Sequence, residues 1–157
     1  MEDERLRRCC FAGHSSVYDA DISSKIKNAV IPLIEEHGVT DFCVGNYGQF
    51  DHYAASVIRE LQKEYPQISV SLVIPYLTKD INEYKELYAK NYNSILMADI
   101  PEGTPRNLKI IKANQYMVDW SAHLVCYINQ GCGGAAKTYE YALKKKIDVI
   151  NIGSYCG

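Results

Sequence analysis

The chain has 157 residues, of which 47% are apolar and 23% are charged, so we expect one globular domain over residues 1–157 with a sizeable core. Its formal net charge is −2, and its one basic run, 144–146, falls at a predicted helix end. This balance argues against nucleic acid as a main partner, because duplex-binding proteins usually carry a basic face. No segment has the apolar length of a signal peptide or a membrane helix, and we therefore expect a cytoplasmic protein that does not bind membranes.

Short apolar runs alternate with helical patterns along the chain. The runs are nearly continuous in apolar residues, which is typical of strands covered on both faces. Strands are predicted at 8–12, 39–44, 68–74, 94–98, 123–128 and 148–152. Helices are predicted at 22–33, 54–65, 79–92, 108–120 and 135–146, with a kink or an early end at Pro32. This strict alternation predicts an α/β, Rossmann-like three-layer sandwich with a mainly parallel sheet.

Residues that directly follow the strands are the candidates for ligand binding, because ligands of open parallel sheets bind outside the carboxyl ends of the strands. Two glycine-bearing turns stand there, and each introduces a helix. Glycine lets the backbone approach a ligand, and a helix start offers unpaired N–H groups, so this combination suits a phosphate. The candidates are Gly13, His14, Gly45, Asn46, Gly48, Phe50, Asp51, Pro75, Tyr76, Gly131, Gly133, Gly134, Ala135 and Thr138.

We assign the phosphate to the turn at 131–135 and the sugar to the surroundings of Gly48 and Asp51. Asp51 could instead only cap the second helix, and either turn could be a tight connection without a ligand. Aromatic side chains in these loops, Tyr47, Phe50 or Tyr76, could stack on a base.

The stretch at 131–136 formally matches the dinucleotide fingerprint G-x-G-x-x-A, but it follows the fifth predicted strand, and no acidic residue ends the next strand. We therefore expect no nicotinamide cofactor. The six cysteines contain no C-x-x-C pair and the four histidines are scattered, which predicts free buried thiols and no metal site. A stripe of Tyr84, Tyr88 and Tyr92 favours packing, against the sheet or a second subunit, over base stacking.

Four stretches, CCFAGH, VGNYGQFDHYAA, NQYMVDWSAHLVCY and GGAAKTYEYALKKKIDVINI, follow one another along nearly the whole chain. In this order they resemble the YpsA-like proteins of the SLOG superfamily, which also contains DprA/Smf and the Lonely Guy phosphoribohydrolases. The resemblance implies a Rossmann-like fold that binds nucleotides or nucleotide-derived ligands, often as a homodimer. The family positions that it carries over are Gly13, His14, Gly45, Gly48, Asp51, Asn114, Met117, Asp119, Gly133 and Gly134.

The chain departs from that family pattern at positions that bear on phosphate binding. Ser15 and Ala113 stand where relatives have arginine, so two phosphate-binding guanidiniums implied by the resemblance are missing, and Lys112 is one position away from the second. Ala135 stands where relatives have threonine, and Thr138 lies one turn further on.

The sequence leaves three hypotheses about function open. The leading hypothesis is a domain that binds a nucleotide-like small molecule. The second is a nucleoside 5′-monophosphate N-glycosidase, in which Asp51 or Glu140 helps to expel the base, because an oxocarbenium-like transition state needs a nearby carboxylate; Glu140 does not fall in the register of the Lonely Guy motif G-G-x-G-T-x-x-E. The third is a non-catalytic assembly module with a decayed pocket.

Overall fold

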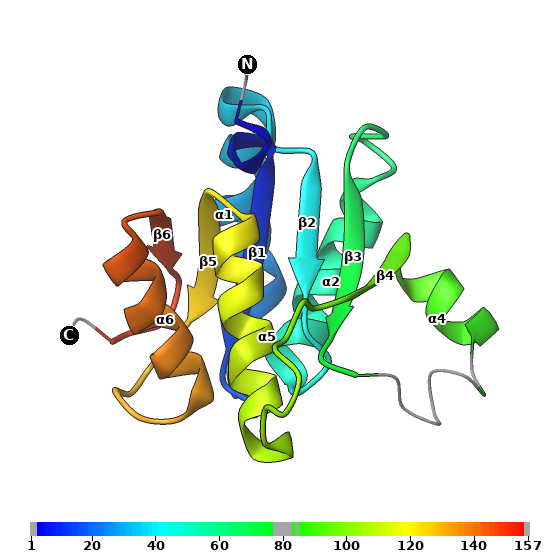
Figure 1. Cartoon of the computed structure of the whole chain (residues 1–157). Helices are drawn as coiled ribbons and strands as arrows, with labels where there is room; N and C mark the ends of the chain where they lie inside the picture. The colour runs from blue at the N-terminus through cyan, green and yellow to red at the C-terminus, as the bar shows by residue number, and fades with distance from the viewer. Residues whose placement is uncertain (1–2, 77–82, 84, 156–157) are drawn as a thin grey trace.

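The computed structural model describes residues 3–76, 83 and 85–155 and shows a sheet with helices on both faces (Figure 1). The strands are β1 Arg8–Gly13, β2 Asp41–Val44, β3 Ser69–Ile74, β4 Ser94–Met97, β5 His123–Tyr127 and β6 Asp148–Asn151. They form one sheet in the order β4-β3-β2-β1-β5-β6, and every neighbouring pair is parallel. The predicted α/β class with a parallel sheet is confirmed.

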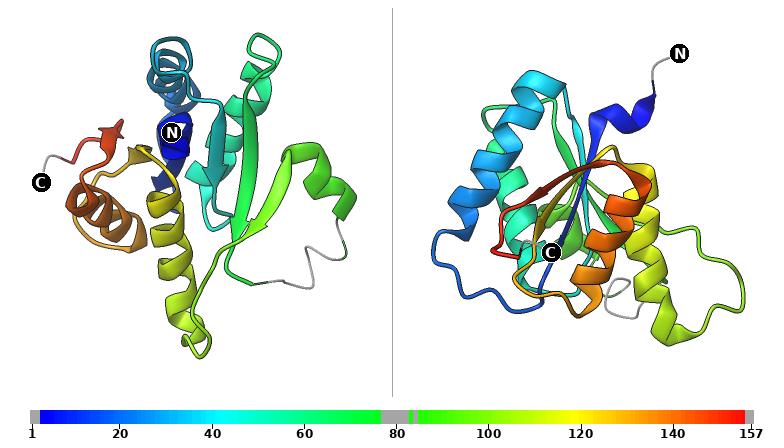
Figure 2. Two further views of the ribbon diagram at one scale, coloured as in Figure 1. Left: turned by 45° about the horizontal axis from the view of Figure 1, so that its top comes forward. Right: turned by 90° about the vertical axis from the view of Figure 1, so that its left-hand side faces the viewer.

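The helices divide between the two faces of the sheet, as the right-hand view of Figure 2 shows with the sheet seen from its edge. They are the 3₁₀ turn η1 Glu4–Arg7 and the α-helices α1 Ile22–His37, α2 Gln49–Leu61, α4 Lys85–Asn91, α5 Arg106–Trp120 and α6 Gly134–Lys145. Helices α1 and α2 cover one face, and α5 and α6 cover the other.

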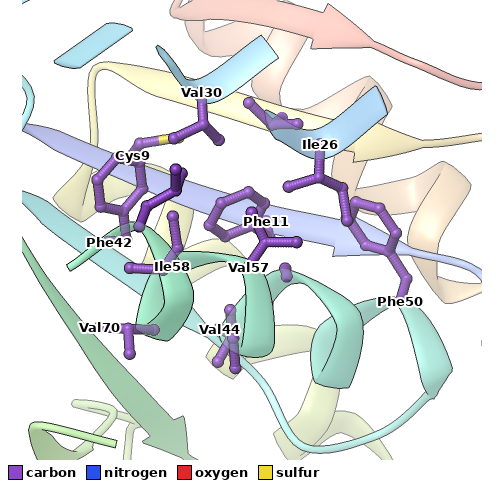
Figure 3. Packing of buried hydrophobic residues seen from close by; sticks show 14 of the residues in the cluster. Cys9, Phe11, Ile26, Val30, Phe42, Val44, Phe50, Val57, Ile58 and Val70 are labelled. Atoms are coloured by element: carbon purple, nitrogen blue, oxygen red, sulfur yellow. The ribbon is translucent and has the colours of Figure 1, made fainter. Parts of the chain in front are cut away.

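Successive residues of β1 serve the two faces in turn, because side chains alternate along a strand. Cys9 and Phe11 enter the core beneath α1 and α2, whereas Cys10 and Ala12 enter the core beneath α5 and α6. In the first core the ring of Phe11 stacks on Phe42 at 5.9 Å between centroids (Figure 3). Each fully buried side chain of this size stabilises the fold by about 1.5–3 kcal/mol relative to exposure.

Several details differ from the sequence-based prediction or complete it. Helix α1 does not end early at Pro32, but continues to His37 and ends at Gly38, whose φ of 67° is left-handed. Helix α2 begins five residues before the predicted start, since the polar turn of Gln49 and its neighbours is already helical.

The predicted buried thiols are confirmed at Cys9, Cys10, Cys43 and Cys126, while Cys132 is exposed and Cys156 lies outside the described residues. Of the tyrosine stripe, Tyr84 lies outside the described residues. The rings of Tyr88 and Tyr92 stack at 6.2 Å, and both pack against the core of α1 and α2, so this part of the stripe packs against the fold as expected.

Gly13, at the end of β1, is needed for packing. A Cβ atom there would lie 2.3 Å from Cγ of Phe50, whose fully buried ring stacks on Tyr127 at 6.0 Å. We expect Gly13→Ala to lower the free energy of unfolding by about 1–3 kcal/mol, because the Phe50 ring must leave its position. Urea denaturation followed by circular dichroism measures this change.

The matched control is Gly134→Ala, since a Cβ atom at Gly134 meets nothing within 4 Å. It should leave the free energy of unfolding within about 0.5 kcal/mol of the unmodified chain, as surface substitutions usually do. Equal stability of the two variants would contradict this reading of Gly13.

Candidate functional site

The site lies where the direction of the sheet reverses. From β1 the chain adds β2, β3 and β4 on one side, then returns to place β5 on the other side of β1. The connections that leave β1 and β5 lead to helices on opposite faces, α1 and α6, and such a reversal opens a crevice at the carboxyl ends of the strands. A pocket of about 520 Å³ occupies this crevice.

Seven of the predicted site residues line the pocket, and they come from four different loops and helices. They are Gly13, His14, Asp51, Asn114, Gly133, Gly134 and Ala135. Tyr47, expected as a stacking side chain, also lines it. The predicted site residues did not include the other lining residues, which are Phe11, Ala12, Ser15, Ser16, Tyr18, Ile110, Asn129, Gln130 and Cys132. Five of these, Ser15, Ser16, Asn129, Gln130 and Cys132, stand in the loops after the first and fifth predicted strands, where the sequence placed the ligand.

The start of α6 faces this pocket without a cap. Gly133 precedes the helix with φ of 95°, a conformation that glycine adopts readily, and no side chain caps the helix. The first hydrogen bond of the helix runs from the Lys137 N–H to the Gly133 carbonyl at 3.1 Å, so the amides of Gly134, Ala135 and Ala136 have no acceptor within the helix. Because a Cβ atom at Gly133 or Gly134 would meet nothing within 4 Å, this turn is open.

The loops after β1 and β5 are joined across the pocket. The Asn129 N–H donates to Nε2 of His14 at 2.9 Å, and the His14 N–H donates to the Tyr127 carbonyl at 3.4 Å. With Nε2 as the acceptor, the neutral His14 ring carries its proton on Nδ1. Burial lowers the pKa of His14, which also favours the neutral ring.

Residues at the end of β6 and just after it form hydrogen bonds to the loop after β5. Oδ1 of Asn129 accepts hydrogen bonds from the Ser154 N–H at 2.8 Å and from its hydroxyl at 3.0 Å. Oδ1 of Asn151 accepts from the Ile128 N–H at 3.0 Å. These bonds fix the loop before it reaches the start of α6.

Asp51 lies in the first turn of α2 and is one of the residues that line the pocket. The carboxyl accepts a hydrogen bond from the Tyr47 N–H at 3.3 Å, just ahead of the helix, so it serves the helix start and the pocket together. Burial raises the pKa of Asp51 to about 7, while the Tyr47 N–H acts in the opposite direction. Near neutral pH this carboxyl can therefore donate as well as accept a hydrogen bond.

Three of the predicted glycines make room for protein atoms. A Cβ atom at Gly48 would lie 2.6 Å from Cα of Ser15, and one at Gly131 would lie 2.8 Å from the Tyr155 hydroxyl. Gly45 lies beside the Asp51 carboxyl. The first amide of α2 is also not free to bind a ligand, because the Gln49 N–H donates to the Ser15 carbonyl at 2.9 Å. Of the two glycine-bearing turns, the one before α6 thus keeps open amides.

Four further predicted residues belong to the interior or to the rim. Phe50 is fully buried and Pro75 is buried in the core region. Thr138 is buried, and its hydroxyl donates to the Gly134 carbonyl at 3.0 Å, within α6. Tyr76 is half-buried under the side chains of Arg106 and Lys109.

Two predicted residues lie elsewhere on the molecule. Asn46 lines a second hollow of about 400 Å³ between α2 and α4. Asp119 is at the far end of α5, where its carboxylate accepts from the Tyr141 hydroxyl at 2.8 Å. The structure therefore does not bring either residue to the pocket at β1 and β5.

The two positions that lack arginine differ in their surroundings. Ser15 lines the pocket, whereas Ala113 is buried against the sheet. Among the described residues that line the pocket there is no lysine or arginine, and the groups there without an acceptor within α6 are the amides at its start.

Within the described ranges, no three histidine, cysteine, aspartate or glutamate side chains come together in a way that could hold a metal ion. The described helices include none with the length and apolar character needed to cross a membrane.

Comparison with solved structures shows where else this fold occurs. DNA processing protein A of Streptococcus pneumoniae matches with a TM-score of 0.64 and 13% identity, over 90% of this chain and 48% of that chain. DNA processing protein A of Helicobacter pylori, a protein with a single-stranded DNA binding mode, matches with a TM-score of 0.62 and 12% identity, over 94% of this chain and 67% of that chain. At such identities the likeness shows the fold alone.

Sequence comparison places the chain in a family. UPF0398 proteins of Bacillus cereus strains B4264 and G9842 are each 29% identical to it over an alignment of 111 positions, and the match covers 66% of this chain and 59% of theirs. The match thus spans less than two thirds of the length of these curated relatives. The family model YpsA, described as the YspA SLOG family, matches residues 13–152 and so includes the loops that form the pocket. The chain therefore belongs to the YpsA family of SLOG proteins.

Proposed function

We propose that this protein binds a nucleotide or a nucleotide-derived small molecule in the pocket between β1 and β5. The observation that carries the proposal is the uncapped start of α6, which opens into the pocket at Gly133 and Gly134. Main-chain amides at a helix start bind phosphate through hydrogen bonds and through the positive end of the helix dipole. The pocket volume of about 520 Å³ is in the range typical of small-molecule sites.

The other walls of the pocket suit the sugar and the base. Asp51 and Asn114 offer hydrogen-bonding groups for ribose hydroxyls. Tyr47 and Tyr18 line the pocket and are 41% and 94% exposed, so their rings are accessible to a base. Phe50, which the sequence predicted as a stacking residue, is not available to a base because its ring is enclosed in the core.

A small molecule suits this site better than a nucleic-acid strand. The formal net charge is −2, and strand-binding grooves depend on many lysine and arginine contacts to phosphates. The open pocket also argues against a decayed site that serves assembly alone. The homodimer and the cytoplasmic location stay predictions.

An N-glycosidase is the second candidate, and the protonated carboxyl of Asp51 favours it. A carboxyl with a pKa near 7 is suited to donate a proton to a departing base, while water adds to the anomeric carbon. Glu140 does not share this role, because it is exposed on α6 and is not among the described residues that line the pocket.

We expect Gly134→Val to weaken the binding of AMP or ADP-ribose by about tenfold or more, because each lost charge-assisted hydrogen bond costs about 1.5–3 kcal/mol. The new side chain has room in the folded protein, since nothing lies within 4 Å of the position of its Cβ atom, and it fills the space assigned to the phosphate. Isothermal titration calorimetry measures the affinity.

Lys144→Val, in the last turn of the same helix, is the matched control and should bind as the unmodified chain does. The proposal fails if AMP, ADP-ribose, NAD and cyclic nucleotides give no heat with the unmodified chain. It also fails if Gly134→Val leaves every affinity unchanged.

If the protein is an N-glycosidase, nucleoside 5′-monophosphates should release free base, and Asp51→Asn should slow this release by about a hundredfold or more, as expected for loss of a general acid. The rate should fall as the pH rises above about 7, because Asp51 then loses its proton. Liquid chromatography detects the base. No free base at high enzyme concentration would rule out this activity for the substrates tested.

The raised pKa of Asp51 also predicts that the stability of the folded chain depends on pH. Its pKa is raised from 3.8 to about 7 in the folded chain, so the unfolded chain ionises first and stability is lost as the pH rises from about 4 to 7. Asp51→Asn removes this loss. Its stability relative to the unmodified chain should therefore increase by about 2 kcal/mol between pH 5 and pH 8.

Urea denaturation at the two pH values measures that difference. Asp19→Asn is the control, because the hydrogen bond from Lys25 lowers the pKa of Asp19; this carboxyl is ionised in both states throughout the range, and its effect should not change with pH. A constant difference for Asp51→Asn would show that Asp51 is ionised in the folded protein at pH 5.

A further inference from the structure

Two cations stand together on one aromatic ring at the start of α5. The guanidinium of Arg106 lies 5.2 Å and the ammonium of Lys109 lies 5.5 Å from the centroid of the Tyr76 ring. Within the described part of the chain neither cation forms an ion pair with a carboxylate. Both side chains therefore contact the ring, and among the described residues no carboxylate neutralises their charges.

The helix itself gains nothing from this arrangement. The first turn of α5 contains Arg106 and no acidic residue, although a helix start is stabilised by negative rather than positive charge. The charges at this end are thus unfavourable for the helix dipole, and an anion bound there would offset them.

The cations continue one wall of the pocket. Arg106, Ile110 and Asn114 follow one another at intervals of four residues and so share a face of α5, and Ile110 and Asn114 line the pocket. Arg106 stands about 6 Å further along the helix axis than Ile110. The start of α5 projects beyond the carboxyl ends of the strands (Figure 1), which puts Arg106 at the outer rim.

Tyr76 itself follows β3, whose last residue is Ile74. The carboxyl ends of parallel strands meet at one edge of a sheet, so the ring that carries the two cations lies at the same edge as the loops that form the pocket.

We propose that Arg106 and Lys109 bind a second phosphate of the ligand, and that the ligand is a nucleotide with two phosphates separated by a nucleoside, such as a dinucleotide. This inference rests on the proposed function, in which the first phosphate lies at the start of α6. Adjacent phosphates, as in ADP, would remain together at α6. A phosphate displaced by one nucleoside could reach the rim, where a guanidinium held on an aromatic ring offers paired N–H donors.

The test compares AMP, ADP and the 5′-phosphorylated dinucleotide pApA by isothermal titration calorimetry. The unmodified chain should bind pApA about tenfold or more tightly than AMP, as expected for one additional charge-assisted contact. The double variant Arg106→Gln, Lys109→Gln should bind pApA about as weakly as AMP, with its affinities for AMP and ADP changed by less than about twofold.

The control removes two positive charges that lie away from the pocket, one directly before β1 and one in the last turn of α6. Arg7→Gln with Lys144→Gln, outside the pocket and the rim, should leave all three affinities unchanged. Thermal melting of each variant verifies that it is folded.

Equal affinities of the unmodified chain for pApA and AMP would overturn the inference, as would an equal loss of AMP, ADP and pApA binding in the double variant. In either case AMP binding that is sensitive to Gly134→Val would still uphold the proposed function. If the unmodified chain binds none of the three probes, both proposals are wrong.

Discussion

The parallel pairing of β1 with strands on both of its sides is the constraint on which the rest of the structure depends. β1 pairs with β2 on one side and with β5 on the other, and its last residue, Gly13, pairs with Tyr127. Strands β1 and β5 therefore end at the same level, and the connections that follow them depart to opposite faces of the sheet. A space between these connections is a geometric consequence of the topology, before any side chain is chosen.

The glycines of the site then show how the chain uses that space. Gly13 admits the ring of Phe50, Gly48 admits the backbone of Ser15, and Gly131 admits Tyr155. These three glycines allow protein atoms to pack closely and hold the loops in place. Gly133, with its positive φ, and Gly134 instead leave the start of α6 open toward the pocket. In the proposed function, main-chain amides there take the place of the arginines that the family resemblance implies at Ser15 and Ala113.

The sequence predicted much of the fold, because the alternation of apolar runs with helical patterns is a local property. It predicted the pocket less completely, because burial depends on what the rest of the chain brings near. Phe50 follows a strand as a ligand-stacking ring would, yet it faces the core between Phe11 and Tyr127. Ile110 gives no signal of its own, since it reaches the pocket through the packing of α5. Asn129 stands in the loop after the fifth predicted strand, but its hydrogen bond to His14 is visible only in the structure. The sequence does not mark Arg106 as a candidate for phosphate binding, because its position on the Tyr76 ring is visible only in the structure.

The account depends most on the claim that open main-chain amides at the start of α6 bind the phosphate of a nucleotide. A titration of the ¹⁵N-labelled protein with AMP, followed by two-dimensional ¹H–¹⁵N NMR, observes these amides directly. The account predicts that the resonances of Gly134, Ala135 and Ala136 shift downfield and saturate together, because their N–H groups gain a charged acceptor. Shifts that leave these three resonances in place and instead map to the hollow between α2 and α4 would contradict it.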